Sequence, residues 1–231
     1  MFFKLYLYLN FIYHSKNEHG VHSPFVFNLV TKCFYDKNKH ESYTAIRAYR
    51  DDILKSKNVT LKKSILPLKD AKTLCRIVNY FKPKSILAIE KPHGLATKVL
   101  KNNENNVKVN TVAFDFTDLN QDFINQNHKK INSQFLKHVK TGTDNANLFD
   151  FIYFDENYIL NDLLHYFELF LPTINNNSVW IFANFNQNID IINAWKIIKN
   201  HPKVTVTVST FRFTIVFFRT EQQKEHFVIR L

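Results

Sequence analysis

From residue 84 onward the chain alternates short apolar runs with longer amphipathic segments, and this alternation limits the fold more than any other feature. Helices that cover both faces of a parallel sheet bury its strands completely, so such strands appear as continuous hydrophobic runs. The pattern therefore predicts an α/β fold whose mostly parallel sheet is closed by an antiparallel hairpin at its edge. The expected strands are 84–90, 107–114, 135–140, 148–154, 178–184, 203–210 and 212–219, and the expected helices between them are 94–101, 117–132, 158–171 and 188–200.

The first 66 residues show a different pattern, because helical periodicity dominates and no strand run occurs there. Helices are expected at 2–16, 23–35 and 41–56, the second opening with Ser23 as its cap and Pro24 at the first helical position. A polar, basic linker over 56–66 precedes a further amphipathic helix at 67–81. We therefore predict an N-terminal helical extension with its linker over 1–66 and an α/β domain over 67–231.

The chain is strongly basic, with 31 Lys and Arg against 20 Asp and Glu and a formal net charge of +11. Such a surface is typical of proteins that bind nucleic acids or anionic membranes. The lysines are scattered singly, however, whereas a binding stripe needs them gathered on one stretch. We therefore attribute the charge to a composition rich in Lys, Asn, Ile and Phe, and nucleic-acid binding stays a hypothesis with only the net charge behind it.

The apolar segment Phe2–Tyr13 resembles a targeting sequence in composition, but Lys4 and Asn10 interrupt it and no small-residue cleavage site follows. It is also too short to cross a bilayer. We expect a packed first helix here, with a helix on a membrane surface as the alternative. Cys33 and Cys75 lie within apolar helical patterns without CxxC spacing, which predicts reduced core residues in a cytoplasmic protein.

Glycine is scarce: the chain has three, against about 16 at average usage. The scarcity matters at residues 86–94, where the buried run Ile-Leu-Ala-Ile-Glu leads into Lys-Pro-His-Gly and then a helix. A loop that approaches a nucleotide closely needs glycine, because a Cβ blocks the approach or forbids a positive φ. This strand-turn-helix segment therefore has the outline of a nucleotide-binding turn with most of its glycine chemistry replaced.

Four blocks spread over the whole chain resemble one protein family, the class I S-adenosylmethionine-dependent methyltransferases, and within it an uncharacterised group from Bacteroidetes. The blocks are His19–Val26 with Tyr35–Lys37 behind it, Tyr80–Leu87, His201–Thr207 and Lys224–Arg230. The resemblance implies a Rossmann-like domain with a seven-stranded sheet that ends in an antiparallel hairpin. It also implies S-adenosylmethionine as the cofactor and transfer of a methyl group to an acceptor that the sequence does not identify.

The departures from this family gather at the cofactor site. The family's first strand ends in a pattern like E-x-G-x-x-x-G, and here the acid is Ala88, the first glycine is Glu90 and only Gly94 is kept. The acid that follows the second strand and holds the ribose is Ala113 here, with Asp115 two residues later as a substitute. Since three contact positions differ, the resemblance implies a weakened cofactor site.

Asp155 ends the strand Phe151–Phe154 and matches the Asp of the family's F-I-D-G-x-H pattern. Metal-dependent O-methyltransferases place a magnesium ligand at a related strand end and an Asp-Asn pair after the fifth strand. Here that pair is Ala183 and Asn184, and Mg²⁺ favours carboxylate oxygens, so we expect no metal site. Asp155 is left as a catalytic acid or base, or as a cap of the following helix.

The candidate cofactor-binding residues are Glu90, His93, Gly94, Asp115 and Asp155, and Asp155 is the candidate catalytic residue. His93 has a plainer interpretation as a turn residue, and the pair His19 and His22 is expected to be a packed, hydrogen-bonded cap of the second helix, with a role in closing the site as the alternative. Trp180 and Phe182 are expected in the core. The aromatic run 211–218 is expected either in the core or at a homodimer face.

Two functional hypotheses follow. The favoured one is a degenerate methyltransferase-fold protein with weak or no catalysis that binds a protein partner or another ligand. The alternative is an active methyltransferase with a rebuilt pocket, in which Asp115 holds the ribose and Asp155 lies near the acceptor.

Overall fold

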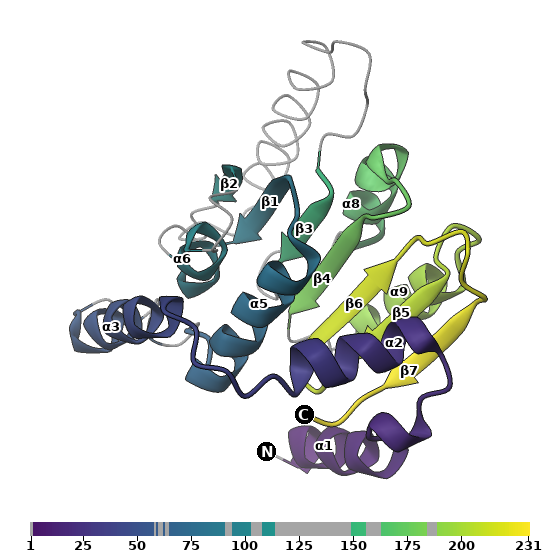
Figure 1. The fold of residues 1–231 in the computed structure, drawn as a ribbon, viewed down its shortest axis with the longest axis horizontal. Coiled ribbons are helices and arrows are strands. Elements are labelled where there is room, and N and C mark those ends of the chain that lie inside the picture. The colour runs from purple at the N-terminus through teal and green to yellow at the C-terminus, as the bar shows by residue number, and fades with distance from the viewer. Residues whose placement is uncertain are drawn as a thin grey trace.

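The computed structural model describes residues 2–57, 65–90, 94–102, 108–113, 149–155, 163–183 and 189–231, together with Val59 and Lys62. One mixed sheet runs through these residues, and helices lie in front of it and behind it (Figure 1). The Rossmann-like α/β fold predicted from the sequence is confirmed.

The strands of the sheet follow the order β2-β1-β3-β4-β6-β5-β7. Strands β1, β2, β3 and β4 are parallel neighbours, β6 is antiparallel to both β4 and β5, and β7 is parallel to β5. Their bounds are β1 Ser85–Glu90, β2 Lys108–Ala113, β3 Phe151–Phe154, β4 Val179–Ala183, β5 Val206–Ser209, β6 Phe213–Phe217 and β7 Glu225–Val228.

The sheet differs from the prediction on the side of the hairpin, while one predicted strand stays untested. The predicted strand 135–140 lies outside the described residues. The predicted hairpin forms as β5 and β6, but the expectation that it closes the sheet is wrong, because β7 lies outside β5 and makes the edge. The residues of β7 are Glu-His-Phe-Val, which is too short and too polar to predict a strand from the sequence. The stretch is a strand because it pairs with β5.

The helices form two layers, one on each face of the sheet (Figure 1). The strand side chains alternate between them, so Ile86 and Ala88 pack in one cluster while Leu87 and Ile89 pack in the other. The first layer contains α2 (Pro24–Leu29) with its π-helical continuation Val30–Phe34, α3 (Ser42–Lys55), α5 (Leu68–Phe81) and α6 (Leu95–Lys101), and the second contains α8 (Leu163–Phe170) and α9 (Ile189–Asn200).

Helices α2 and α3 share a core with the α/β segment. Val26 and Leu29 of α2 are completely buried in the same cluster as Leu74 and Val78 of α5. The predicted cap of α2 is confirmed, since the Ser23 hydroxyl accepts a hydrogen bond from the main chain of Val26 and Pro24 opens the helix. The division into two domains at residue 66 stays a prediction.

The second cluster is dominated by aromatic rings. Phe154 of β3 and Phe182 of β4 stack with their centroids 4.6 Å apart, and Trp180 meets Phe218 edge to face at 4.8 Å. The expectation that Trp180 and Phe182 belong to the core is confirmed, and the run 211–218 follows its core alternative because Phe213 and Phe217 are buried. Cys33 and Cys75 are buried free thiols, as predicted.

Candidate functional site

The carboxyl ends of β1, β2 and β3 meet at one edge of the sheet, which is where parallel α/β sheets bind their ligands. The last residue of β1, Glu90, is in register with the last residue of β2, Ala113. On the other side of β1, Ile89 is in register with Phe154, the last residue of β3. Neighbouring strands are about 4.8 Å apart, so this register places Glu90, Ala113 and Asp155 at adjacent positions of the edge.

Asp155, the candidate catalytic residue, continues β3 by one position. Its main-chain N–H donates a hydrogen bond of 3.0 Å to the carbonyl oxygen of Ile89, and its side chain is half-buried. This bond holds the main chain of Asp155 against the end of β1. The main chain of Asp155 therefore lies beside the end of β1, where Glu90 is the last residue.

Gly94 begins the helix that follows β1. It is the cap residue of α6, with φ −64° and ψ 152°, and its carbonyl oxygen accepts the first bond of the helix, from Lys98, at 3.4 Å. This backbone is open to any residue, so the helix itself does not require glycine here. The other two candidates from this region, His93 and Asp115, lie outside the described residues, and for Glu90 the structure describes the main chain in β1.

Two positions where the family resemblance implies an acid are small apolar residues that the sheet encloses. Ala88 has an exposed fraction of 0% and lies in the apolar cluster beneath α5 and α6. Ala183 ends β4, where it is buried and in register with Phe213 of β6. Neither side chain has a polar atom, so neither position offers a hydrogen bond or a metal ligand.

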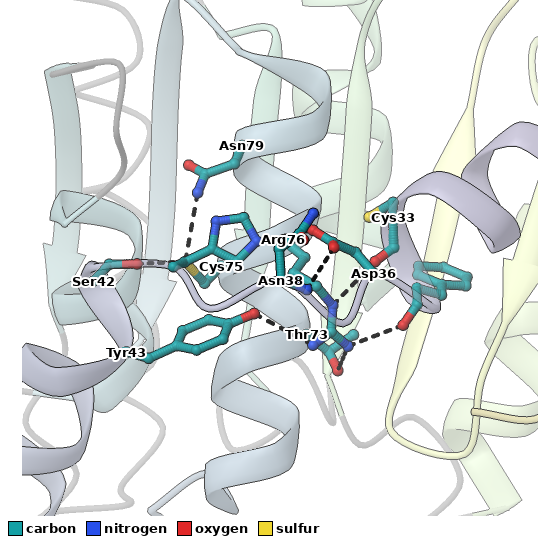
Figure 2. A network of polar contacts seen from close by, with 11 residues as sticks. Cys33, Asp36, Asn38, Ser42, Tyr43, Thr73, Cys75, Arg76 and Asn79 are labelled. Atoms are coloured by element: carbon teal, nitrogen blue, oxygen red, sulfur yellow. Dashed lines mark hydrogen bonds and ion pairs between the residues drawn. The ribbon is translucent and has the colours of Figure 1, made fainter.

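Polar side chains gather instead in a network between α5 and the segment 33–43 (Figure 2). Arg76 of α5 is at its centre. The Nε of Arg76 donates to the carbonyl oxygen of Cys33 at 3.0 Å, and one terminal nitrogen donates to the carbonyl oxygen of Phe34 at 3.1 Å. The guanidinium also reaches the hydroxyl groups of Thr73 at 3.0 Å and Tyr43 at 3.4 Å. Arg76 therefore satisfies the carbonyl groups at the end of the π-helical turn.

Asp36 and His40 extend this network on the loop before α3. Oδ2 of Asp36 lies 2.9 Å from Nε2 of His40, and Oδ1 accepts the main-chain N–H of Asn38 at 2.8 Å. Burial alone would raise the pKa of Asp36, but the hydrogen bonds from Asn38 and His40 and the charges of His40 and Arg76 together lower it. These contacts connect residues 36, 38 and 40 and so stabilise the loop before α3.

The two cysteines are buried in the same region. The hydroxyl of Ser42 lies 3.1 Å from Sγ of Cys75, and the amide of Asn79 donates to that sulfur at 3.7 Å (Figure 2). Burial raises the pKa of the Cys33 thiol far above its ordinary value, which keeps it protonated and weakly nucleophilic. The network therefore has a structural role. Sequence reasoning missed it, because a single Arg in an amphipathic helix does not signal which carbonyl groups it meets.

The histidine pair near the start of α2 does not form the cap that the sequence predicted. The side chain of His19 is 82% exposed and lies 3.6 Å from Glu18, and His22 is exposed as well. The hydroxyl of Ser23 caps the helix instead. Within the part of the chain that the structure describes, no group of three His, Cys, Asp or Glu residues is placed to hold a metal ion.

No protein-family model and no curated protein sequence matches this chain. Solved structures do match it. The SAH-bound methyltransferase PaMTH1 of Podospora anserina is 10% identical, with 86% of this chain and 97% of that chain covered and a TM-score of 0.53. The O-methyltransferase TomG of Streptomyces achromogenes, solved with SAM, is 12% identical, with 82% and 95% covered and a TM-score of 0.53. The chain therefore has the Rossmann-like α/β fold of class I methyltransferases.

Proposed function

We propose that this protein is a degenerate methyltransferase-fold protein, of the Bacteroidetes group that its sequence blocks resemble, with weak or no methyl transfer. It keeps the scaffold on which PaMTH1 and TomG hold SAH or SAM, and S-adenosylmethionine is the cofactor that this likeness indicates. The observation that supports degeneracy is the chemistry of the strand ends. Where the family resemblance implies two acids for the cofactor, β1 has Ala88, two residues before its end, and β2 ends in Ala113.

The remaining donors at this edge fit the cofactor poorly. Glu90 is the last residue of β1, at the position of the family's close-approach glycine, and it introduces a negative charge where the cofactor's own carboxylate would approach. A charge-assisted hydrogen bond contributes roughly 1.5–3 kcal/mol. The loss of two such bonds corresponds to a weakening of more than about a hundredfold, which moves a micromolar site to the millimolar range.

Isothermal titration of the whole protein with S-adenosylmethionine and S-adenosylhomocysteine, with and without Mg²⁺, tests this proposal. We expect no binding tighter than millimolar for either compound. The matched variant is Glu90→Gly with Ala113→Glu, which returns the last residues of β1 and β2 to the family's residues. This double variant is expected to bind more tightly than the wild type.

Micromolar binding by the wild type, equal to that of the double variant, would overturn the proposal in favour of the active alternative. In that alternative Asp155, whose main chain is held at the end of β1, lies near the acceptor. Asp155→Asn would then reduce methyl transfer while leaving cofactor binding close to that of the wild type. Asp115 would hold the ribose, and Asp115→Asn would weaken binding itself.

A further inference from the structure

Helix α1 (Phe2–His14) is far more apolar than its burial explains. Ten of its 13 residues are Phe, Leu, Tyr or Ile, and the other three are Lys4, Asn10 and His14. Among the side chains of this helix that the structure describes, residues 5–14, only Phe11 is buried. A helix that is apolar all round is normally enclosed by protein or lipid. This helix therefore presents an apolar surface that the rest of the chain leaves uncovered.

Four of the five exposed apolar residues of the helix share one side, and the fifth, Tyr8, is 44% exposed. At 100° per residue, positions 5, 9, 13 and 6 fall within an arc of about 100°. Phe11 lies outside this arc and packs on Phe211 with ring centroids 5.5 Å apart, and Tyr8 contacts the same ring at 5.0 Å. One side of α1 is thus attached to the β5–β6 turn. The opposite side, which we call the outer face, has exposed fractions of 55% at Leu5, 64% at Tyr6, 58% at Leu9 and 85% at Tyr13.

The charged residues beside α1 are mainly basic. Helix α1 contains no acidic residue. Lys16 follows it and is exposed, and its main chain pairs with Val228 and with Arg230, which is also exposed. Arg212 lies 5.9 Å from the Phe211 ring, while its own acidic partner, Asp70, is mostly buried. The acidic residue that follows α1 in the sequence is Glu18, which is half-buried and lies beside His19. An anionic surface close to α1 therefore meets more positive than negative charge.

The shape and length of α1 favour a flat partner. The helix lies at the rim of the molecule beside the C-terminus, outside the sheet and its two layers (Figure 1). Its 13 residues span about 20 Å, which is shorter than a bilayer core, and no helix among the described residues is long and apolar enough to cross a membrane. Tyrosine rings with leucines between them suit the boundary between headgroups and acyl chains, because each ring has an apolar body and a polar tip.

We infer that α1 is an interfacial helix that docks this protein on an anionic membrane surface, with the outer face inserted at the headgroup boundary and Lys16 and Arg230 contacting the headgroups. Apolar insertion and basic attraction together give the two signals that stable peripheral binding requires. The partner is a lipid surface, and it is independent of whether the strand ends bind a cofactor.

Co-sedimentation of the full chain with vesicles tests the inference. Binding is expected to vesicles of phosphatidylcholine containing phosphatidylserine, and to be weaker both for pure phosphatidylcholine and at high salt. The double variant Leu5→Ser with Leu9→Ser is expected to lose at least about tenfold in vesicle affinity, because two leucines no longer transfer into lipid. Ile197→Ser is the matched control, since Ile197 on α9 is 59% exposed and lies outside α1.

Absence of vesicle binding by the wild type would overturn the inference, and so would an equal loss in the Ile197→Ser variant. Light scattering tests the alternative that a second copy of the chain occupies the outer face. A stable dimer that the double variant dissociates, without vesicle binding, would assign the outer face to a second copy of the chain. Circular dichroism distinguishes these outcomes from misfolding, and both variants are expected to keep the wild-type spectrum because the replaced side chains are exposed.

Discussion

Strand β3 is flanked by two aspartates, and they are used differently. At its start, the carboxylate of Asp150 accepts two main-chain hydrogen bonds, from Lys84 at 2.8 Å and from Ser85 at 2.9 Å. At its end, Asp155 is attached to β1 through its main-chain N–H, which donates to Ile89. Asp150 therefore holds the start of β1 through its side chain, and Asp155 is bonded to the end of β1 through its main chain.

This comparison contrasts an attachment through a side chain at the start of β1 with an attachment through the main chain at its end. A carboxylate with two N–H donors stabilises a chain start in the way a helix cap does, and the main-chain N–H of Val179 adds a third bond, to the carbonyl oxygen of Asp150. At the carboxyl edge the enclosing residues Ala88 and Ala183 are small and apolar. We therefore expect that adding an acid at Ala88 and removing the acid at Asp150 both lower the free energy of unfolding.

The largest effect is expected for Ala88→Glu, which places a carboxylate in the apolar cluster. We expect the free energy of unfolding in urea to fall by more than about 3 kcal/mol, because Ala88 is completely buried and a lone buried charge is strongly destabilising. Ala88→Gln separates charge from size and should cost less at neutral pH. Equal losses for Glu and Gln would mean that crowding, not charge, limits this position.

Asp150→Ala is expected to be next, with a loss of about 2–3 kcal/mol in the free energy of unfolding, since two charge-assisted bonds disappear and two N–H groups lose their acceptor. Asp150→Asn keeps one acceptor oxygen and should lose roughly half as much. Denaturant unfolding followed by fluorescence measures both. A neutral result for Asp150→Ala would remove the contrast between the two edges.

Low pH should destabilise the fold through two groups that are distant from the ends of β1 and β3, His226 and Asp36. Burial, with the charges of Lys199 and Lys224, lowers the pKa of His226 to about 4, and its Nδ1 lies 2.9 Å from the hydroxyl of Thr207. The unfolded chain binds this proton near pH 6.5, so stability present above pH 6.5 is lost as the pH falls toward 4. The lowered pKa of Asp36 adds a loss at still lower pH, as the pH falls through its folded value.

Thermal melts at a series of pH values measure this loss. In the variant His226→Gln the dependence between pH 6.5 and 4 should become flatter, while the part due to Asp36 at lower pH remains. A pH profile identical to that of the wild type would show that His226 titrates alike in the folded and unfolded chain.

The smallest change in stability is expected for Asp155→Asn, which keeps the shape of the side chain and the main-chain bond to Ile89. The free energy of unfolding should change by less than it does in Asp150→Asn. Parallel urea curves for the two Asn variants make the comparison direct. A larger loss at Asp155 would mean that its carboxylate, like that of Asp150, has mainly a structural role.

Sequence reasoning succeeded where local periodicity decides structure. The amphipathic pattern of 67–81 became α5, and the buried run at 84–90 became β1. The cap formed by Ser23 was predictable for the same reason, because its hydrogen-bond partner Val26 lies only three residues away. The position of Asp155 directly after a parallel strand also followed from the sequence, and its role stays a prediction.

Sequence reasoning missed what depends on partners distant in the chain. Strand β7 is short and half-polar, and it becomes a strand through pairing with β5. Arg76 carries no pattern of its own, yet it holds carbonyl groups 42 and 43 residues earlier in the chain. Asp150 likewise gives no signal in the sequence of the two N–H groups that it binds 65 and 66 residues away.

The sequence by itself determined the α/β alternation and the absence of acids at Ala88 and Ala113, because periodicity and residue identity are local properties. Only the tertiary structure decided that Ala88 is sealed in the core, that the hairpin lies inside the sheet, and that α1 keeps an apolar face uncovered. Each of these depends on which surfaces meet when the chain closes. Burial results from contacts between segments that are distant in the chain, so no segment determines it alone.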